Sequence, residues 1–201
     1  MVSNEQILVT KRNGRGKESL NIDKIHSMVG FATEGITGVS ASHVEMNSGI
    51  QFFNGITTED IQQILIKSAN DLISLENPNY QFVAARLLLF SLRKNLFHRL
   101  WEHPKFIEHI KKLIDLGLYD KGILENYTEA EIDRMGMWID HERDYNFTYA
   151  GLRQVMDKYL VQDRSTGEIF ETPQFMYMMI SATLFAKYPT ESRLQYVKKY
   201  Y

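Results

Sequence analysis

The chain has 201 residues, of which 44% are hydrophobic, and its 23 basic and 25 acidic residues give a net charge of −2. A chain of this length and composition buries a substantial core in one or two globular domains. The near-neutral charge excludes a general attraction to nucleic acid or to an anionic membrane, so we expect neither partner, and any phosphate site requires a local cluster of cations. The sequence contains no cysteine, which excludes disulfides, zinc fingers, iron–sulfur sites and thiol nucleophiles among these residues.

Two features of the composition indicate a cytoplasmic location. The first residues, MVSNEQILV, lack an apolar core long enough for a signal peptide, and no window approaches about 18 uninterrupted apolar residues. The absence of cysteine fits a reducing compartment.

The chain begins with a predicted β-hairpin. Residues 7–12, ILVTKR, alternate and are β-branched, Asn13-Gly14 supplies turn residues, and ESLNI forms the second strand. Asp23 then opens a helix with apolar residues at helical spacing, which stops near Glu34-Gly35.

Three more helices are predicted before residue 101, which gives a mainly α fold. One follows VSAS and ends at Asn54-Gly55, with four inner residues: Val44, Met46, Ile50 and Phe52. A third begins at the capping pair of Thr57 and Asp60, and the longest runs from Tyr80 to about Trp101. We expect the hairpin and the four helices to form one compact domain, residues 1–100.

The second half, residues 101–201, has its own helices. HPKFIEHIKKLIDLGLYD is amphipathic, a capping box joins Thr128 to Glu131, and YLVQDRSTGEIFETP predicts a second short hairpin. Thr172 and Pro173 then open the helix PQFMYMMISATLF, which lacks a polar face. Because such a helix requires burial on every side, we expect this half to be incomplete alone.

Cations gather around the first hairpin, at Lys11, Arg12, Arg15 and Lys17. Together with Lys24 on the next helix, Thr58 at a helix start and Lys94 near the end of the longest helix, they suit a polyphosphate, because helix N-termini and lysines attract anions. A solvated basic turn is the alternative. The sequence has neither a Walker A motif nor G-x-G-x-x-G, which excludes a P-loop and a Rossmann site.

The carboxylates and histidines indicate less chemistry. Asp140, His141, Glu142 and Asp144 are consecutive or nearly so, and their side chains would point around a helix axis rather than at one centre, so we expect a structural helix end. The six histidines show no ligand spacing, and we predict no metal site.

Four motifs of the first half resemble an ATP-cone, the four-helix nucleotide-binding regulatory domain at the N-terminus of many ribonucleotide reductases: LVTKRNG, NIDKI, GITTEDIQ and NYQFVAARLLLFSLRK. Two later stretches resemble the segment between that cone and the catalytic barrel of the class I (Ia-like) large, or alpha, subunit: IDHERDYNFTYAGLRQVMDKYLVQDRSTGEIFETPQFMYM and RLQYVKKYY. The later stretches are the more specific, because ATP-cones also occur in other reductase classes and in zinc-ribbon repressors.

The resemblance implies a set of allosteric nucleotide-binding residues. Val9, Lys11 and Arg12 would lie along the nucleotide, Glu18 and Asn21 near base or sugar, Lys24, Thr58 and Lys94 at the phosphates, and Leu20, Ile25 and Phe90 in the pocket wall. Gln62 and Ser91 stand where the family often has histidines, and NGRGKE has an extra residue, so we expect weaker or differently placed discrimination between ATP and dATP.

The resemblance also implies a function and its partners. The chain would be the ATP- or dATP-binding front end, with Mg²⁺ and no covalently bound cofactor, of a ribonucleoside-diphosphate reductase that makes deoxyribonucleotides for DNA replication. Its partners would be the remainder of the alpha subunit or a complementing chain, a radical-generating beta subunit, and further copies of the enzyme. The catalytic residues of the family lie in the barrel, so none is expected here, whether the chain is a fragment or a split-gene product. Two alternatives are a free-standing nucleotide-sensing module and a helical interaction protein with a basic hairpin.

Overall fold

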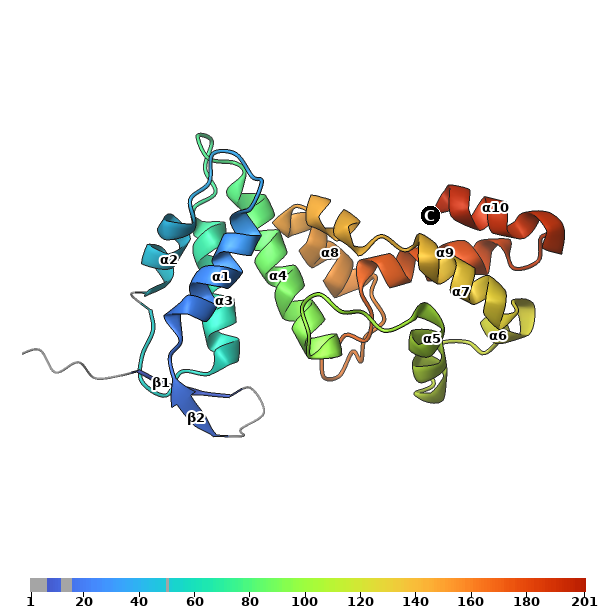
Figure 1. Ribbon diagram of the computed structural model, residues 1–201, viewed down its shortest axis with the longest axis horizontal. Helices are drawn as coiled ribbons and strands as arrows, with labels where there is room; N and C mark the ends of the chain where they lie inside the picture. Colours follow the sequence, from blue (N-terminus) through green and yellow to red (C-terminus); the bar gives the residue numbers. More distant parts are fainter. Residues whose placement is uncertain (1–6, 12–15, 50) are drawn as a thin grey trace, which may run out of the picture. The chain divides into compact units, whose positions relative to one another are not determined.

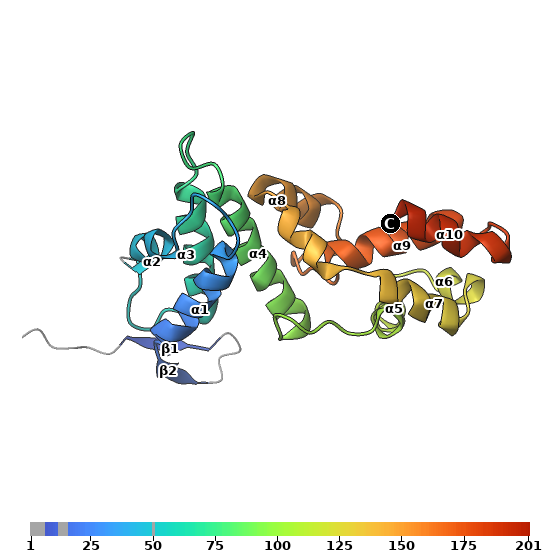
Figure 2. The ribbon, with the colours of Figure 1, turned by 45° about the horizontal axis from the view of Figure 1, so that its top comes forward.

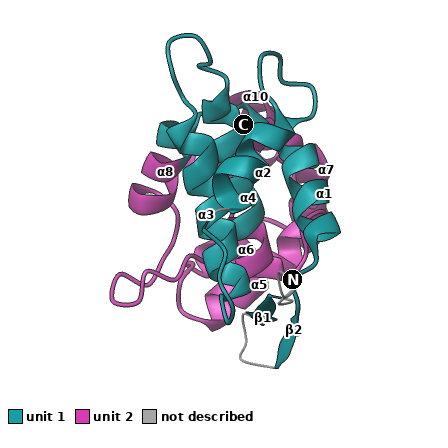
Figure 3. Ribbon diagram, turned by 90° about the vertical axis from the view of Figure 1, so that its left-hand side faces the viewer, with its two compact units in different colours: residues 1–91, 145–152 teal, residues 92–144, 153–201 magenta. Residues whose placement is uncertain are grey.

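A computed structural model describes residues 7–11, 16–49 and 51–201 and divides the chain into two compact units. The first unit comprises Met1–Ser91 with Tyr145–Leu152, and the second comprises Leu92–Asp144 with Arg153–Tyr201 (Figure 3). The division falls within the longest helix, ahead of the residue 100 at which the sequence predicts a domain boundary.

The predicted N-terminal hairpin is confirmed. Strands β1 (Leu8–Thr10) and β2 (Lys17–Ser19) pair antiparallel, with Val9 opposite Glu18. Val9 is the residue of the hairpin that enters the core, where only 3% of it is exposed. The turn that connects the strands, with Arg12 and Arg15, lies outside the described residues.

Four helices accompany the hairpin in the first unit, as the sequence predicts (Figure 1). They are α1 (Ile22–Thr33), α2 (Ala41–Gly49), α3 (Thr58–Asp71) and α4 (Tyr80–Phe97). The helices enclose an aliphatic core that includes Val29, Val44, Leu65 and Leu87, all of them fully buried. Burial of such side chains contributes about 1.5–3 kcal/mol each, so this core is the main source of the unit's stability.

Three predicted helix bounds differ from the structure. Helix α1 begins at Ile22 rather than Asp23, because Asn21 is its N-cap. Helix α2 ends at Gly49, so Phe52 lies beyond it, and Met46 is 71% exposed rather than an inner residue; Ile50 lies outside the described residues. Helix α4 ends at Phe97 rather than Trp101.

The end of α4 has a local cause. His98, the next residue, has a φ of 59°, in the left-handed region that interrupts a right-handed helix. No apolar period in the sequence changes at this residue, which explains why the pattern alone extends the helix too far.

The second unit is helical. Its elements are α5 (Phe106–Asp115), α6 (Gly122–Asn126), α7 (Glu129–Trp138), a 3-10 helix η1 (His141–Asn146), the later part of α8 (Tyr149–Lys158), α9 (Pro173–Phe185) and α10 (Thr190–Tyr200). Helix α10 runs beside α9 (Figure 2). The sequence did not predict α6, whose single turn is too short to show a period.

Capping and ion pairing fix the ends of these helices. The predicted capping box of Thr128 and Glu131 is present at α7, and Thr172 and Pro173 are the N-cap and first residue of α9. The Glu131 carboxylate also forms an ion pair with Arg193 of α10, in which Arg193 Nη2 lies 2.6 Å from Glu131 Oε2. Because both side chains are nearly buried, this pair anchors α10 to α7.

Two other predictions for this unit are met in part. The predicted second hairpin is reduced to one antiparallel bridge between Gln162 and Ile169, beside hydrogen bonds from Asp163 N–H to Glu168 C=O and from Phe170 N–H to Val161 C=O. Helix α9 buries one side, including Phe175 and Met178, whereas Leu184 remains 53% exposed.

Among the described residues, no helix combines the length and the apolar character that crossing a bilayer requires.

Candidate functional site

The hairpin is attached to the start of α3 by its free edge. Thr10 forms a parallel bridge with Thr57, and its N–H donates to Ile56 C=O at 2.9 Å. Gly55 N–H donates to Leu8 C=O at 2.8 Å, and Gly55 has a φ of 90°, a conformation that favours glycine. Lys11, the next residue after Thr10, is thereby placed near the N-terminus of α3.

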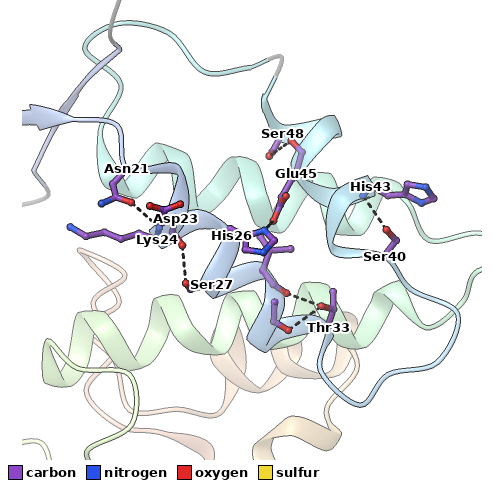
Figure 4. A network of polar contacts seen from close by, with 12 residues as sticks. Asn21, Asp23, Lys24, His26, Ser27, Thr33, Ser40, His43, Glu45 and Ser48 are labelled. Carbon is purple, nitrogen blue, oxygen red and sulfur yellow. Dashed lines mark hydrogen bonds and ion pairs between the residues drawn. The ribbon is translucent and has the colours of Figure 1, made fainter.

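Two lysines meet at one carboxylate beside this junction. Glu18 of β2 lies 3.1 Å from Lys11 Nζ and 3.9 Å from Lys24 Nζ, measured from its two carboxylate oxygens. Lys24 stands on the first turn of α1, where Asn21 Oδ1 accepts its backbone N–H at 3.0 Å (Figure 4). The three charges sum to one positive charge, in a place where two helix N-termini also favour an anion.

The start of α3 is already capped from within. Thr57 Oγ1 accepts Asp60 N–H at 3.0 Å, and the Asp60 carboxylate accepts the Thr57 hydroxyl at 2.6 Å. The predicted capping pair is therefore confirmed, and Asp60 places a negative charge at this helix end. Thr58 follows the cap and is half-buried. An anion at this point would meet the N–H groups of the first turn together with that carboxylate.

Gln62 has a structural role that the sequence did not indicate. It is 3% exposed, and its Nε2 donates to Leu87 C=O at 2.9 Å. This hydrogen bond ties α3 to α4 through a buried side chain and uses one of the two N–H donors of the Gln62 amide.

The apolar residues of the predicted pocket lie in the core of the first unit. Ile25 is 7% exposed and Phe90 is 2% exposed, whereas Leu20 is half-buried. The Phe90 ring meets the Tyr145 ring edge-on, at a centroid distance of 6.3 Å. Lys94 is exposed on the last turn of α4 and belongs to the second unit. Arg12 lies outside the described residues.

A second polar feature of α1 joins it to α2. His26 Nδ1 lies 2.9 Å from Glu45 Oε1 (Figure 4). Among the described residues, no group of three or more histidine, aspartate or glutamate side chains is placed to hold a metal ion.

The carboxylate string 140–144 is more than the predicted helix end. Asp144, on η1, is 1% exposed, and its Oδ2 lies 3.4 Å from Arg93 Nη2 of α4. Burial raises the pKa of Asp144 to about 6, against the hydrogen bond from Gln174 and the charge of Arg93. The signal was available in the sequence: Ala85, Leu89 and Arg93 follow each other at spacings of four, so Arg93 lies on the buried stripe of α4 and requires a counter-charge.

Cavities of about 430, 380 and 500 Å³ lie in the second unit, and none of them is lined by Lys11, Lys24 or the described residues of the hairpin. The largest of them is lined by Phe106, Met137, His141 and Phe175, among other residues. Cavity size therefore does not mark the nucleotide site that the cations indicate, because a polyphosphate binds to surface cations and helix ends rather than in an apolar hollow.

The sequence matches two family models. Residues 7–95 match the ATP cone domain, and residues 145–201 match the ribonucleotide reductase all-alpha domain. The chain thus carries an ATP-cone followed by a reductase all-alpha domain.

Relatives with both parts are ribonucleotide reductase subunits. The chain is 50% identical over 198 residues to ribonucleoside-diphosphate reductase 1 subunit alpha of Escherichia coli. It is 49% identical to the subunit alpha of Haemophilus influenzae and 40% identical to that of Enterobacteria phage T4. Each alignment covers 98% of this chain and 26% of the relative, so the chain spans about a quarter of the length of these curated relatives. It is similar to the N-terminal region of the alpha subunit, where the ATP-cone of these relatives lies.

Proposed function

We propose that this chain binds ATP and dATP, each with Mg²⁺, as the allosteric front end of a ribonucleoside-diphosphate reductase alpha subunit. The observation that carries the proposal is the meeting of Lys11 and Lys24 at Glu18, beside the start of α3. Residues 1–100 form the nucleotide-binding domain, and residues 101–201 begin the catalytic part.

The residues present fit a nucleoside triphosphate. Lys11 and Lys24 are exposed, and each lies within 4 Å of a carboxylate oxygen of Glu18. Both lysines would leave this carboxylate for the phosphate oxygens of a bound nucleotide, which carry more charge. The Glu18 carboxylate would lie near the base or sugar, as the resemblance implies. Magnesium would offset the phosphate charge that the lysines do not neutralise, and its ligands would come mainly from phosphate and water.

The remaining site residues are assigned by the resemblance to the cone. Val9 and Arg12 lie along the nucleotide, Asn21 lies near the base or sugar, Thr58 and Lys94 lie at the phosphates, and Leu20, Ile25 and Phe90 form the apolar wall. Gln62 holds the first turns of α3 against α4 through its hydrogen bond to Leu87 C=O. A glutamine already engaged in this way is less able than a free imidazole to sense the phosphates, so we propose weak discrimination between the two nucleotides.

The bound nucleotide would regulate the complete enzyme. We propose that it biases the packing of α1, α2 and the hairpin, and so the association of alpha subunits with each other and with the beta subunit in the cytoplasm. The cysteines of the reduction would come from the part of the enzyme that this chain does not cover.

Ligand-dependent unfolding tests the proposal. A ligand that binds only the folded state raises its unfolding temperature, so saturating Mg²⁺-ATP should raise that of the wild type, and less so that of Lys24→Ala and Lys94→Ala. Lys67→Ala is the matched control, because Lys67 is an exposed α3 lysine paired with Asp71 on the same helix. Equal shifts in all four proteins would contradict the assigned residues, and no shift in the wild type would contradict nucleotide binding.

A further inference from the structure

A chain of polar side chains crosses the second unit from the end of α4 to the end of α10. Arg93 of α4 pairs with Asp144 of η1, and Gln174 of α9 donates from Nε2 to Asp144 Oδ1 at 2.7 Å. The Tyr201 hydroxyl, directly after α10, donates to Gln174 Oε1 at 2.7 Å. We call these four residues, Arg93, Asp144, Gln174 and Tyr201, the polar relay.

Its inner members are deeply buried. Arg93 is 2% exposed, Asp144 is 1% exposed and Gln174 is 3% exposed. A buried ion pair contributes less to stability than apolar residues of the same volume, because both charges lose their hydration. Stability alone therefore does not account for an arginine and an aspartate at this depth, and such pairs serve best to specify one arrangement over another.

The amide of Gln174 gives the polar relay a direction. Its NH₂ group donates to the Asp144 carboxylate and its carbonyl accepts from the Tyr201 hydroxyl; the reverse orientation would set two acceptors face to face at Asp144 and lose that hydrogen bond. A displacement of Asp144 is thus transmitted to Tyr201 rather than absorbed.

The Tyr201 end is held at three further points. Asp140 N–H donates to its hydroxyl oxygen at 3.0 Å, and Arg143 Nη1 donates to its carbonyl oxygen at 3.0 Å. The Arg143 guanidinium also lies 4.9 Å from the centre of its ring. Tyr201 is therefore fixed by the same η1 region that holds Asp144.

Arg93 Nη2 has two acceptors in this structure. Arg93 Nη2 donates to His141 C=O at 2.6 Å but lies 3.4 Å from Asp144, so the carbonyl holds it more closely than its counter-ion does. A small movement of the last turn of α4 would exchange these two acceptors. Lys94, the neighbour of Arg93 on that turn, is one of the proposed phosphate contacts.

We propose that the polar relay couples the nucleotide state of the last turn of α4 to the position of the C-terminal end of α10. The inference rests on the proposed function and adds the route by which its signal leaves the cone. Arg93, Asp144, Gln174 and Tyr201 are positioning residues, and none of them contacts the nucleotide.

Tyr201→Phe is the sharpest variant, because it removes the hydroxyl and keeps the ring under Arg143. Tyr200→Phe is its matched control, since Tyr200 is 60% exposed and its ring contacts Phe185 instead. Hydrogen exchange of residues 196–201 is measured in the 201-residue chain with and without saturating Mg²⁺-ATP. We expect ATP to change this exchange in the wild type and in Tyr200→Phe, and the change to fall about fivefold in Tyr201→Phe, at the low end of typical allosteric couplings.

A double-mutant cycle separates the polar relay from nucleotide binding. Urea unfolding of Asp144→Asn, Tyr201→Phe and the double variant should give non-additive losses, because the two side chains share Gln174. Additive losses, or an equal exchange response to ATP in Tyr201→Phe and the wild type, would overturn the polar relay while ATP binding stands. An absence of any ATP response in the wild type would overturn the nucleotide dependence of the polar relay if ATP still raises the unfolding temperature of the chain, and would overturn the proposed function if ATP does not.

Discussion

Acidification to pH 5 should destabilise the second unit, because the buried His109 and the half-buried His103 and His141 lie there around Phe175. His109 stacks on the Phe175 ring at a centroid distance of 4.3 Å, and His141 meets it edge-on at 4.9 Å. His103 stacks on His141 at 3.6 Å. His109 Nε2, His103 Nε2 and His141 Nδ1 are buried without a hydrogen-bond partner, so protonation would leave each new N–H unsatisfied.

The pKa shifts give the sign of the effect. Burial, and secondarily Lys112, lowers the pKa of His109 to about 3. Burial, followed by His103, Arg93 and His109, lowers the pKa of His141 to about 3. A folded-state pKa below the ordinary 6.5 gives stability that is fully present above pH 6.5 and is lost as the pH falls toward 3.

The magnitude follows from the same values. At pH 5, which is roughly 1.5 units below the ordinary histidine pKa, histidines of the unfolded chain bind protons that His109 and His141 of the folded chain do not. At about 1.4 kcal/mol per unit, this stabilises the unfolded chain by about 2 kcal/mol for each of the two residues. Asp144 opposes them: its pKa is raised to about 6, so its protonation stabilises the fold by roughly 1.4 kcal/mol at pH 5. The free energy of unfolding should therefore fall by about 3 kcal/mol between pH 8 and pH 5, and His103, whose pKa is lowered to about 4, acts in the same direction.

Urea unfolding followed by tryptophan fluorescence measures this loss. Both tryptophans of the chain, Trp101 and Trp138, lie in the second unit and report its unfolding. His109→Phe, which keeps an aromatic ring beside Phe175, should remove about 2 kcal/mol of the acid loss of about 3 kcal/mol. A free energy of unfolding that is equal at pH 8 and pH 5, or an acid loss that persists in full in His109→Phe, would refute the reasoning.

Three further outcomes are expected. Asn21→Ala should lower the free energy of unfolding by about 1 kcal/mol and Asn21→Asp should not, because only the first removes the N-cap of α1, as urea titrations would show. The chain should form no dCDP from CDP with any beta subunit, because dithiol chemistry requires cysteines; product formation in a chromatographic assay would contradict this. ATP and dATP at equal saturation should give different oligomer distributions of the complete enzyme in sedimentation; identical distributions with identical activity would mean that the cone binds nucleotide without switching.

Much of the fold follows from local sequence rules. Thr57 with Asp60 and Thr128 with Glu131 place the starts of α3 and α7, because a capping box depends only on residues within one turn. Helix ends were harder to predict. Helix α4 stops at the left-handed His98, and no residue type or period in its sequence marks that conformation.

The contacts of the candidate site were also hard to predict, because they join residues that lie far apart in the sequence. The basic hairpin was predicted from its composition, but its attachment to residues 54–57 is a contact across about 45 residues, which no periodicity encodes. Gln62 and Arg93 are similar cases. Both are polar residues on buried faces of their helices, and only the packing of α3, α4 and η1 shows that their partners are Leu87 and Asp144.

Calorimetric titration of Mg²⁺-ATP into the 201-residue chain tests the central claim most directly. The account predicts a saturable heat with a dissociation constant in the micromolar range, about −8 kcal/mol of binding free energy. The same titration of Lys24→Ala should give a larger dissociation constant, because the variant lacks the cation that lies beside Glu18 and would contact the phosphates. A wild-type titration that shows no heat with either ATP or dATP, together with an unfolding temperature that neither nucleotide changes, would contradict the assignment of this region as a nucleotide-binding cone.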